Sequence, residues 1–272
     1  MSGSVTRREF LASMGAAASL GAARSDGAPY RIGIETYCFH DVDLAAALRH
    51  TAGLGLKYLE LHDGHLPPNA SAGQMAAART ALASAGIEAE GVYIHDAFTE
   101  SEEVARPIFE FARAMRFRYI TGGPRRESLP LLNRLVPEYQ VQIAVHNHGP
   151  GARYETLEHV TSVLDAYRNI TACIDIGHFA RSRVDPVKAI RAIGRRAVAI
   201  HVKDVDAAGE NIAVGEGTID MEGVFRALRD VRFDGLLVLE YEGDLDDMGR
   251  RLAGMKRSLE AMRRYLDRAA AG

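Results

Sequence analysis

The sequence predicts a single (β/α)₈ barrel, and three observations support that prediction. Short runs rich in Val, Ile and Leu alternate with stretches of helical periodicity along the chain, as expected for buried parallel strands in βα units. The chain has 272 residues, and one such barrel typically needs about 250. Four consecutive runs end in an imidazole or a carboxylate. Because the carboxyl ends of all strands surround one mouth of the barrel, these side chains should meet there.

The first 28 residues differ from the rest in composition. Arg7 and Arg8 precede a stretch rich in Ala, Gly and Ser, which lacks the periodic apolar face of a first core helix. The pattern resembles a twin-arginine export signal. We therefore expect residues 1–28 to be a cleaved signal, residues 29–272 to form the barrel, and the mature protein to be periplasmic or extracellular. The apolar stretch is too short and too weakly hydrophobic for a permanent membrane span.

The first four βα units follow one another without a linker. Their predicted strands are 31–39, 57–64, 87–95 and 117–123, and their predicted helices are 43–54, 71–85, 101–115 and 126–138. Asp41 or Asp43 could cap the first helix, because an Asp side chain accepts hydrogen bonds from free amides there. Gly86 is a suitable end for the second helix. Gly122 and Gly123 could bring backbone close to a ligand.

Four further units complete the ring. Their predicted strands are 141–148, 171–178, 197–204 and 235–242, and their predicted helices are 154–168, one that starts at Asp185-Pro186, 221–230 and a C-terminal helix. Proline suits the first turn of a helix. Residues 203–220 include a long, polar, Gly-rich stretch, and we expect it to fold across the mouth as a substrate-binding loop.

Composition narrows the classes of partner. The net charge is −3, with mixed signs and no Trp, which argues against nucleic acid as the main partner. Cys38 and Cys173 fall in predicted strands that are well separated in the barrel order, so we expect buried thiols and no disulfide. A homo-oligomer is compatible with the sequence, which gives no clear sign of the oligomeric state.

Four side chains at successive strand ends predict a metal site. They are His146, Asp175, His201 and Glu240. One such residue alone is more often a hydrogen-bonded core or loop residue, but four in phase are unexpected by chance. Imidazole and carboxylate together suit one divalent ion, with carboxylates favouring Mg²⁺ or Mn²⁺ and imidazole favouring Zn²⁺; Co²⁺ is a further candidate.

Other polar residues near the mouth are candidates for catalysis or substrate binding. His148 follows His146 by two positions, so both would point to the same side of an extended strand. His178 could reach the substrate while Asp175 binds the ion. Lys203 could neutralise an oxyanion, or could instead pair with its neighbour Asp204 on the surface. The candidates from the second and third strands are Glu60, His62 and His95.

The motifs, taken in order, resemble a known superfamily. HNHG at 146–149, DIGHF at 175–179, HVKD at 201–204, VGEGTID at 214–220 and LEYE at 239–242 are similar to those of the sugar phosphate isomerase/epimerase superfamily, also described as xylose isomerase-like barrels. The resemblance covers nearly the whole chain after the signal. It implies one divalent ion held from strands five to eight, and strand-end carboxylates that move a proton between neighbouring carbons of a keto sugar. By position, the ligands would be His146, Asp175, His201 and Glu240, and His178 would hold substrate.

Two departures from the family pattern inform the function. His146 replaces a Glu that is an acid-base group in epimerases and isomerases, so the chain looks more like the inosose dehydratase branch. A metal-bound imidazole is a poor base because its lone pair is committed to the ion, which leaves Glu240 as the obvious carboxylate base, with His148, His95 or Glu60 as candidate helpers. Ala207 takes the place of a substrate-gripping Arg of ketose 3-epimerases, and Asp206-Ala207-Ala208 lacks the zinc-binding Asp-x-His pair of related apurinic endonucleases.

Three functions remain open at this stage, all with a small-molecule carbohydrate as the partner. The first is a divalent-metal-dependent isomerase or epimerase of a keto sugar or related polyol, in which Glu240 abstracts the proton next to the carbonyl. The second is a lyase or dehydratase that acts by β-elimination on a 3-keto-glycoside or keto-inositol, with His148 or His178 protonating the leaving oxygen. The third is an exported carbohydrate-binding barrel without catalysis.

Overall fold

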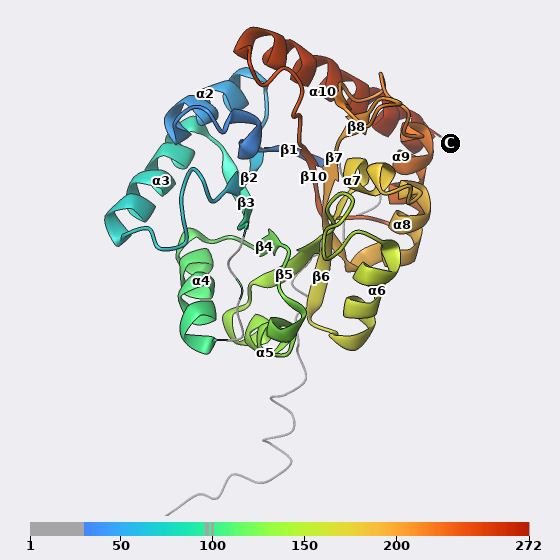
Figure 1. Ribbon diagram of the computed structural model, residues 1–272. Coiled ribbons are helices and arrows are strands. Elements are labelled where there is room, and N and C mark those ends of the chain that lie inside the picture. Colours follow the sequence, from blue (N-terminus) through green and yellow to red (C-terminus); the bar gives the residue numbers. More distant parts are fainter. Residues whose placement is uncertain (1–29, 96–97, 99–100, 272) are drawn as a thin grey trace, which may run out of the picture.

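The computed structural model describes residues 30–95, 98 and 101–271 (Figure 1). Eight parallel strands form a closed barrel in the order β1-β10-β7-β6-β5-β4-β3-β2, which confirms the predicted single (β/α)₈ barrel. The predicted signal, residues 1–28, lies outside the described residues. The barrel strands are β1 (Arg31–Glu35), β2 (Tyr58–His62), β3 (Glu88–Tyr93), β4 (Tyr119–Gly122), β5 (Gln142–His146), β6 (Ile170–Asp175), β7 (Ala197–Val202) and β10 (Leu236–Leu239).

Helices surround the barrel, as Figure 1 shows. They are α2 (Leu44–Gly53), α3 (Ala72–Ala85), α4 (Glu102–Met115), α5 (Leu129–Tyr139), α6 (Leu157–Ala166), α7 (Ile176–Arg181), α8 (Pro186–Ile193), α9 (Met221–Asp230) and α10 (Met248–Ala271). Asp43 caps α2 by accepting a hydrogen bond from the amide of Ala46 at 2.7 Å. Ser71 and Gln74 form a capping box at the start of α3, and Gly86 ends it with a left-handed φ of 66°, as the sequence predicts.

The first strand is shorter than predicted. The chain leaves β1 at Glu35 and makes a 3₁₀ turn, η1 (Thr36–Phe39), where the hydroxyl of Thr36 accepts a hydrogen bond from the amide of His62 at 2.8 Å. Cys38 therefore lies in this turn, and the prediction that it lies in a strand is wrong. Both Cys38 and Cys173 are buried free thiols.

Helix α7 is one element that the sequence prediction missed. Strand β6 ends at Asp175, whose carboxylate then caps α7. The short helix packs closely on Lys203, the residue that follows β7: a Cβ at Gly177 would lie 2.6 Å from the Cβ of Lys203. Only glycine permits this approach, so Gly177 sets the position of His178 one residue later.

The loop after β7 packs differently from the prediction. Its first part forms a hairpin of β8 (Asp204–Val205) and β9 (Asn211–Ile212). Its second part lies against α10, where the amide of Val214 donates to Ser258 at 3.0 Å and Glu216 pairs with Arg257 at 2.7 Å. The expectation that this second part folds across the mouth is therefore wrong.

The barrel interior is divided into an apolar lower part and a polar upper part. Tyr119 fills the lower part, where it packs with Ala144, Cys173 and Ala199. Polar side chains occupy the upper part at the carboxyl ends of the strands, and they build the site described next. Between strands and helices lies the large aliphatic core. None of the described helices combines the length and the apolar character needed to cross a membrane.

Candidate metal centre and active site

The four predicted ligands converge on one point at the mouth of the barrel. His146 ends β5, Asp175 ends β6, His201 lies on β7 and Glu240 follows β10. Nε2 of His146 lies 3.2 Å from Nδ1 of His201, and Oδ2 of Asp175 lies 3.7 and 3.9 Å from these nitrogens. Oε2 of Glu240 lies 2.7 Å from the same Nδ1. All four atoms lie within 4.8 Å of one another, and all four residues are buried.

This arrangement fits a divalent ion. Oδ2 of Asp175 and Oε2 of Glu240 are buried oxygens that accept no hydrogen bond of regular geometry from the described residues. Their near neighbours are Nζ of Lys203, 3.3 Å from the first, and Nδ1 of His201, 2.7 Å from the second, so their lone pairs are directed into a cluster of ligand-type atoms. Bonds of about 2.0–2.2 Å to one ion would place neighbouring ligand atoms about 3–3.5 Å apart. The four pairs given above are 2.7–3.9 Å apart, and all four atoms lie within 4.8 Å. Two imidazoles and two carboxylates suit Zn²⁺, Mn²⁺ or Co²⁺ well.

Asn147 and α7 orient the Asp175 carboxylate. Asn147 donates to the carbonyl of Asp175 and accepts from its amide, both at 2.8 Å, which clamps the ends of β5 and β6 together. Oδ1 of Asp175 accepts the amide hydrogen of His178 at 2.7 Å. Oδ2 is thereby left to face the other three ligands. The sequence prediction gave no role to Asn147, because it points away from the metal.

Glu60 holds the ring of His201 from below. Oε1 of Glu60 lies 2.9 Å from Nε2 of His201, and its Oε2 accepts the hydroxyl of Thr121 at 3.1 Å. A proton on Nε2 leaves the Nδ1 lone pair for the ion, as carboxylate–histidine pairs do in metal sites. Glu60 is 0% exposed and both oxygens are engaged. The prediction that it binds substrate is therefore replaced by a positioning role.

Lys203 is the buried cation of the site. Its Nζ lies 2.9 Å from Oε1 of Glu240, 3.2 Å from Oε2 of Glu242 and 3.3 Å from Oδ2 of Asp175. The alternative of a surface pair with Asp204 is wrong, because both residues are 1% exposed and Asp204 accepts backbone amides of the following loop. Lys203 is too buried to contact substrate directly, so its charge instead stabilises the ionised carboxylates around it.

Lys203 controls the charge of Glu240. Burial alone would raise the pKa of Glu240, but Lys203 and His201 outweigh burial and hold that pKa below its usual value. Glu240 is therefore ionised, which both a ligand and a base require. The same low pKa lowers its intrinsic strength as a base.

Glu35 is a functional candidate that the sequence prediction missed. It ends β1, it is 2% exposed, and its Oε2 lies 3.8 Å from Nδ1 of His201. Burial, and then the charge of Glu240, raise the pKa of Glu35 well above its usual value. Without an ion in the centre, the carboxyl group that faces it from β1 is therefore more readily protonated than an ordinary Glu. A strand boundary drawn at Glu35 would have placed it among the strand-end residues.

His148 and His178 form the rim above the ligands. Their ring centroids are 3.9 Å apart, and Nε2 of His178 lies 3.4 Å from Nζ of Lys203. Burial lowers the pKa of His178 to about 3, so this imidazole is neutral. His148 is exposed and follows the end of β5. Both predicted histidines thus lie where a substrate would meet the centre.

His62 and His95 lie on the opposite side of the mouth. The ring of His62 is half-buried between Tyr37 and Tyr93, with centroids 5.1 and 5.5 Å away. Tyr93 in turn meets His146 edge-on at 5.4 Å. His95 is exposed, with its ring 6.3 Å from Tyr93. His62 is therefore close to the centre, whereas His95 is farther out.

The fold and the site define a parallel (β/α)₈ barrel with ligand-type residues gathered at the ends of β5, β6, β7 and β10. The model of the xylose isomerase-like TIM barrel family matches residues 125–265, more than half of the 272 residues. The chain belongs to this family, which confirms the resemblance seen in its motifs.

Known relatives agree with this assignment. Inosose dehydratase of Clostridium botulinum (strain Eklund 17B / Type B) is 26% identical over 133 residues, which cover 42% of this chain and 44% of the relative. The chain thus matches less than half the length of these curated relatives. A solved structure of an uncharacterised protein from Parabacteroides distasonis ATCC 8503 is 25% identical, with a TM-score of 0.69 over 87% of this chain and 99% of the other. D-psicose 3-epimerase, solved in the presence of D-fructose, has a TM-score of 0.72 at 14% identity, with 87% and 99% covered; this shows a shared fold.

Proposed function

We propose that the protein binds one divalent metal ion and converts a keto sugar or keto polyol by removing the proton next to its carbonyl group. The single observation that carries the proposal is the convergence of four buried ligand atoms within 4.8 Å, from His146, Asp175, His201 and Glu240. Membership of the xylose isomerase-like family supports it.

The residues of the chain divide the work of such a reaction. A divalent ion in this centre would polarise the substrate carbonyl and stabilise negative charge on its oxygen. Glu240, kept ionised by Lys203, takes the proton. His148 and the neutral His178 offer ring nitrogens to substrate hydroxyls at the rim. Glu35, protonated and on another strand, returns a proton to the substrate.

Two outcomes follow from the same proton removal. Return of the proton to carbon gives isomerisation or epimerisation, which is our first assignment. Loss of an oxygen substituent from the next carbon gives β-elimination, the reaction of a dehydratase or lyase. The second outcome is supported by the 26% identity to inosose dehydratase and by Glu35, whose proton could go to the leaving oxygen of a keto-inositol or a 3-keto-glycoside.

We further propose that residues 1–28 direct export through the twin-arginine route, with residues 29–272 as the barrel that acts outside the cytoplasm. The paired Arg7 and Arg8 ahead of the small-residue stretch support this. Export of a fusion of residues 1–28 to a reporter, and its loss when both arginines become lysine, would test the assignment.

Proton exchange tests the proposed reaction directly. The protein, loaded with Mn²⁺, is incubated in D₂O with a 2-keto-inositol, a free ketose or a methyl 3-keto-glucoside, and the α-proton signal is followed by NMR. We expect deuterium to enter at least one substrate, and we expect the Glu240→Gln variant to lose this exchange. Absorbance of an enone identifies elimination. No exchange in any of the three substrates by metal-loaded protein would overturn the proposal.

A further inference from the structure

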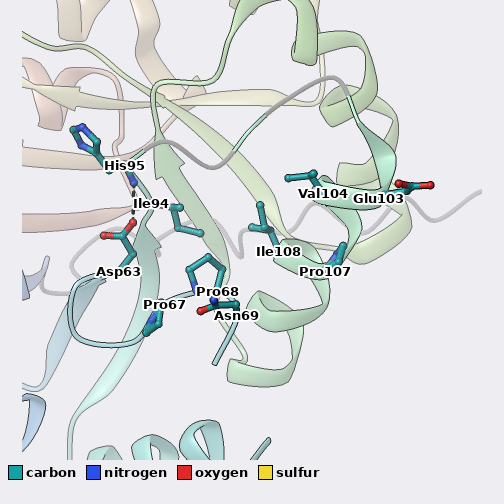
Figure 2. Close-up of a pocket in the computed structure, with 10 residues that line it drawn as sticks. All are labelled: Asp63, Pro67, Pro68, Asn69, Ile94, His95, Glu103, Val104, Pro107 and Ile108. Atoms are coloured by element: carbon teal, nitrogen blue, oxygen red, sulfur yellow. Dashed lines mark hydrogen bonds between the residues drawn. The ribbon is translucent and has the colours of Figure 1, made fainter. Parts of the chain in front are cut away.

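A cavity lies between the loop after β2, the residues that follow β3 and the start of α4. Its volume is about 610 Å³, within the range of about 300–1,000 Å³ that small-molecule pockets occupy. Figure 2 shows the start of α4 on one side and the loop after β2 on the other, with the end of β3 between them. Its apolar lining consists of Pro67, Pro68, Ile94, Val104, Pro107 and Ile108.

The lining suits an apolar ligand better than a sugar. Three of the six apolar residues are prolines, which have no backbone N–H to donate to hydroxyl groups. Ile94 and Ile108 form the buried floor. Val104, in the first turn of α4, is 42% exposed; among the described residues, Val104 and Leu245 are the large hydrophobic side chains that remain exposed. An apolar surface gathered in a cavity typically marks a binding site.

Two polar residues connect the cavity with the candidate centre. At the edge nearest the barrel, the carboxylate of Asp63 accepts the amide hydrogen of His95 at 3.0 Å (Figure 2). The same carboxylate lies 3.3 Å from Nδ1 of His62. His62 stacks on Tyr93, which contacts His146. His62 and Tyr93 do not line the cavity, but their rings connect its edge at Asp63 and His95 with His146 of the centre. Aromatic rings in this place suit the face of a sugar.

We propose that this cavity binds an apolar, ring-containing substituent of the substrate. The substrate would then be a glycoside or a similarly substituted keto sugar, with its sugar over the rings of His62 and Tyr93 and its substituent between Pro68 and Pro107. The inference rests on the proposed function, because it assumes a sugar at the metal centre. A free sugar would leave the apolar lining in water.

A pair of ligands isolates the contribution of the cavity. Phenyl and methyl 3-keto-β-D-glucopyranoside differ in the apolar substituent, and their binding to the Mn²⁺-loaded protein is measured by calorimetry. Burying one ring should make the phenyl compound bind about tenfold more tightly or better. Val104→Asp should bring that preference close to one. Leu245→Asp places the same charge at the other exposed hydrophobic residue and should keep the preference.

Circular dichroism and metal content verify that each variant is folded and loaded. Equal affinities of the wild-type protein for the two compounds, or no binding of the phenyl compound, would overturn the inference. The exchange assay in D₂O on the same samples separates the two proposals. Deuterium exchange without tighter binding of the phenyl compound supports the proposed reaction and contradicts a binding role for the cavity. A Val104-dependent preference for the phenyl compound without exchange supports the binding role of the cavity and contradicts the proposed reaction.

Discussion

Replacing Glu60 by Gln should weaken metal binding although Glu60 is not one of the four proposed ligands. Glu60 accepts a hydrogen bond from Nε2 of His201 and so presents Nδ1 to the ion. Loss of such a supporting carboxylate typically lowers metal affinity about 10- to 100-fold. This corresponds to about 1.4–2.7 kcal/mol. We therefore expect the dissociation constant of Zn²⁺ or Mn²⁺ to rise by that factor in Glu60→Gln.

The structure explains why the change should be partial. A Gln side chain of the same size keeps one oxygen for His201 and turns its amide toward Thr121, whose hydroxyl can rotate to accept. What disappears is the negative charge 2.9 Å from the ring, and with it the stronger hydrogen bond that a carboxylate makes. Thr121→Val removes only the support of Oε2, so its effect should be smaller than that of Glu60→Gln.

Glu90→Gln is the matched control. Glu90 is also buried, at 2% exposed, but its carboxylate pairs with Arg31 at 2.7 Å and Arg118 at 3.3 Å. Neither of these ion-pair partners is one of the four proposed ligands. The substitution should therefore lower stability without changing metal affinity.

Competition with a chromophoric chelator gives the dissociation constants, and far-ultraviolet circular dichroism shows that the variants fold. The reasoning is refuted if folded Glu60→Gln binds metal within about twofold of the wild-type affinity, well short of the expected loss. It is refuted equally if Glu90→Gln weakens metal binding as much, since the effect would then come from any buried carboxylate.

Three further predictions concern proton positions. Without an ion, burial would lower the pKa of His201, but Cys173, Glu60 and Glu240 raise this pKa well above its usual value. Metal binding should therefore release a proton from the protein, and metal affinity should fall as the pH falls. Calorimetry in buffers of different ionisation enthalpy measures the released proton. Glu35→Gln should lower turnover about 10²- to 10⁴-fold with metal affinity unchanged in the chelator assay, and full turnover would remove Glu35 from the reaction. For His178, the pKa falls from 6.5 to about 3 on folding. The unfolded chain therefore binds more protons than the folded chain between these two values, so the free energy of unfolding should decrease as the pH falls through them. Urea titrations should show a smaller decrease for His178→Asn than for the wild-type protein.

The fold and the four strand-end residues could be predicted because their signals are local. Runs of Val, Ile and Leu mark buried parallel strands, and the carboxyl ends of such strands meet at one mouth. His146, Asp175, His201 and Glu240 could therefore be grouped without knowledge of the helices between them. The structure brings all four together.

The parts that sequence could not predict depend on contacts across the barrel. Glu60 and His201 are 141 residues apart, and nothing near Glu60 in sequence indicates that its carboxylate meets the ring of His201. The burial of Lys203 depends on carboxylates from β6 and from the segment after β10. Glu35 was hidden because the apolar pattern continues through Thr36–Phe39, where the chain turns into η1.

Metal content is the most direct test of the centre. The purified protein and its His146→Ala, Asp175→Ala and Glu240→Ala variants are each incubated with Mn²⁺, Co²⁺, Zn²⁺ or Mg²⁺, desalted and analysed by inductively coupled plasma mass spectrometry. We predict about one divalent ion per wild-type chain and a large loss of the ion in each folded variant. A wild-type protein that retains no ion, or variants that retain as much as the wild type, would contradict the metal centre.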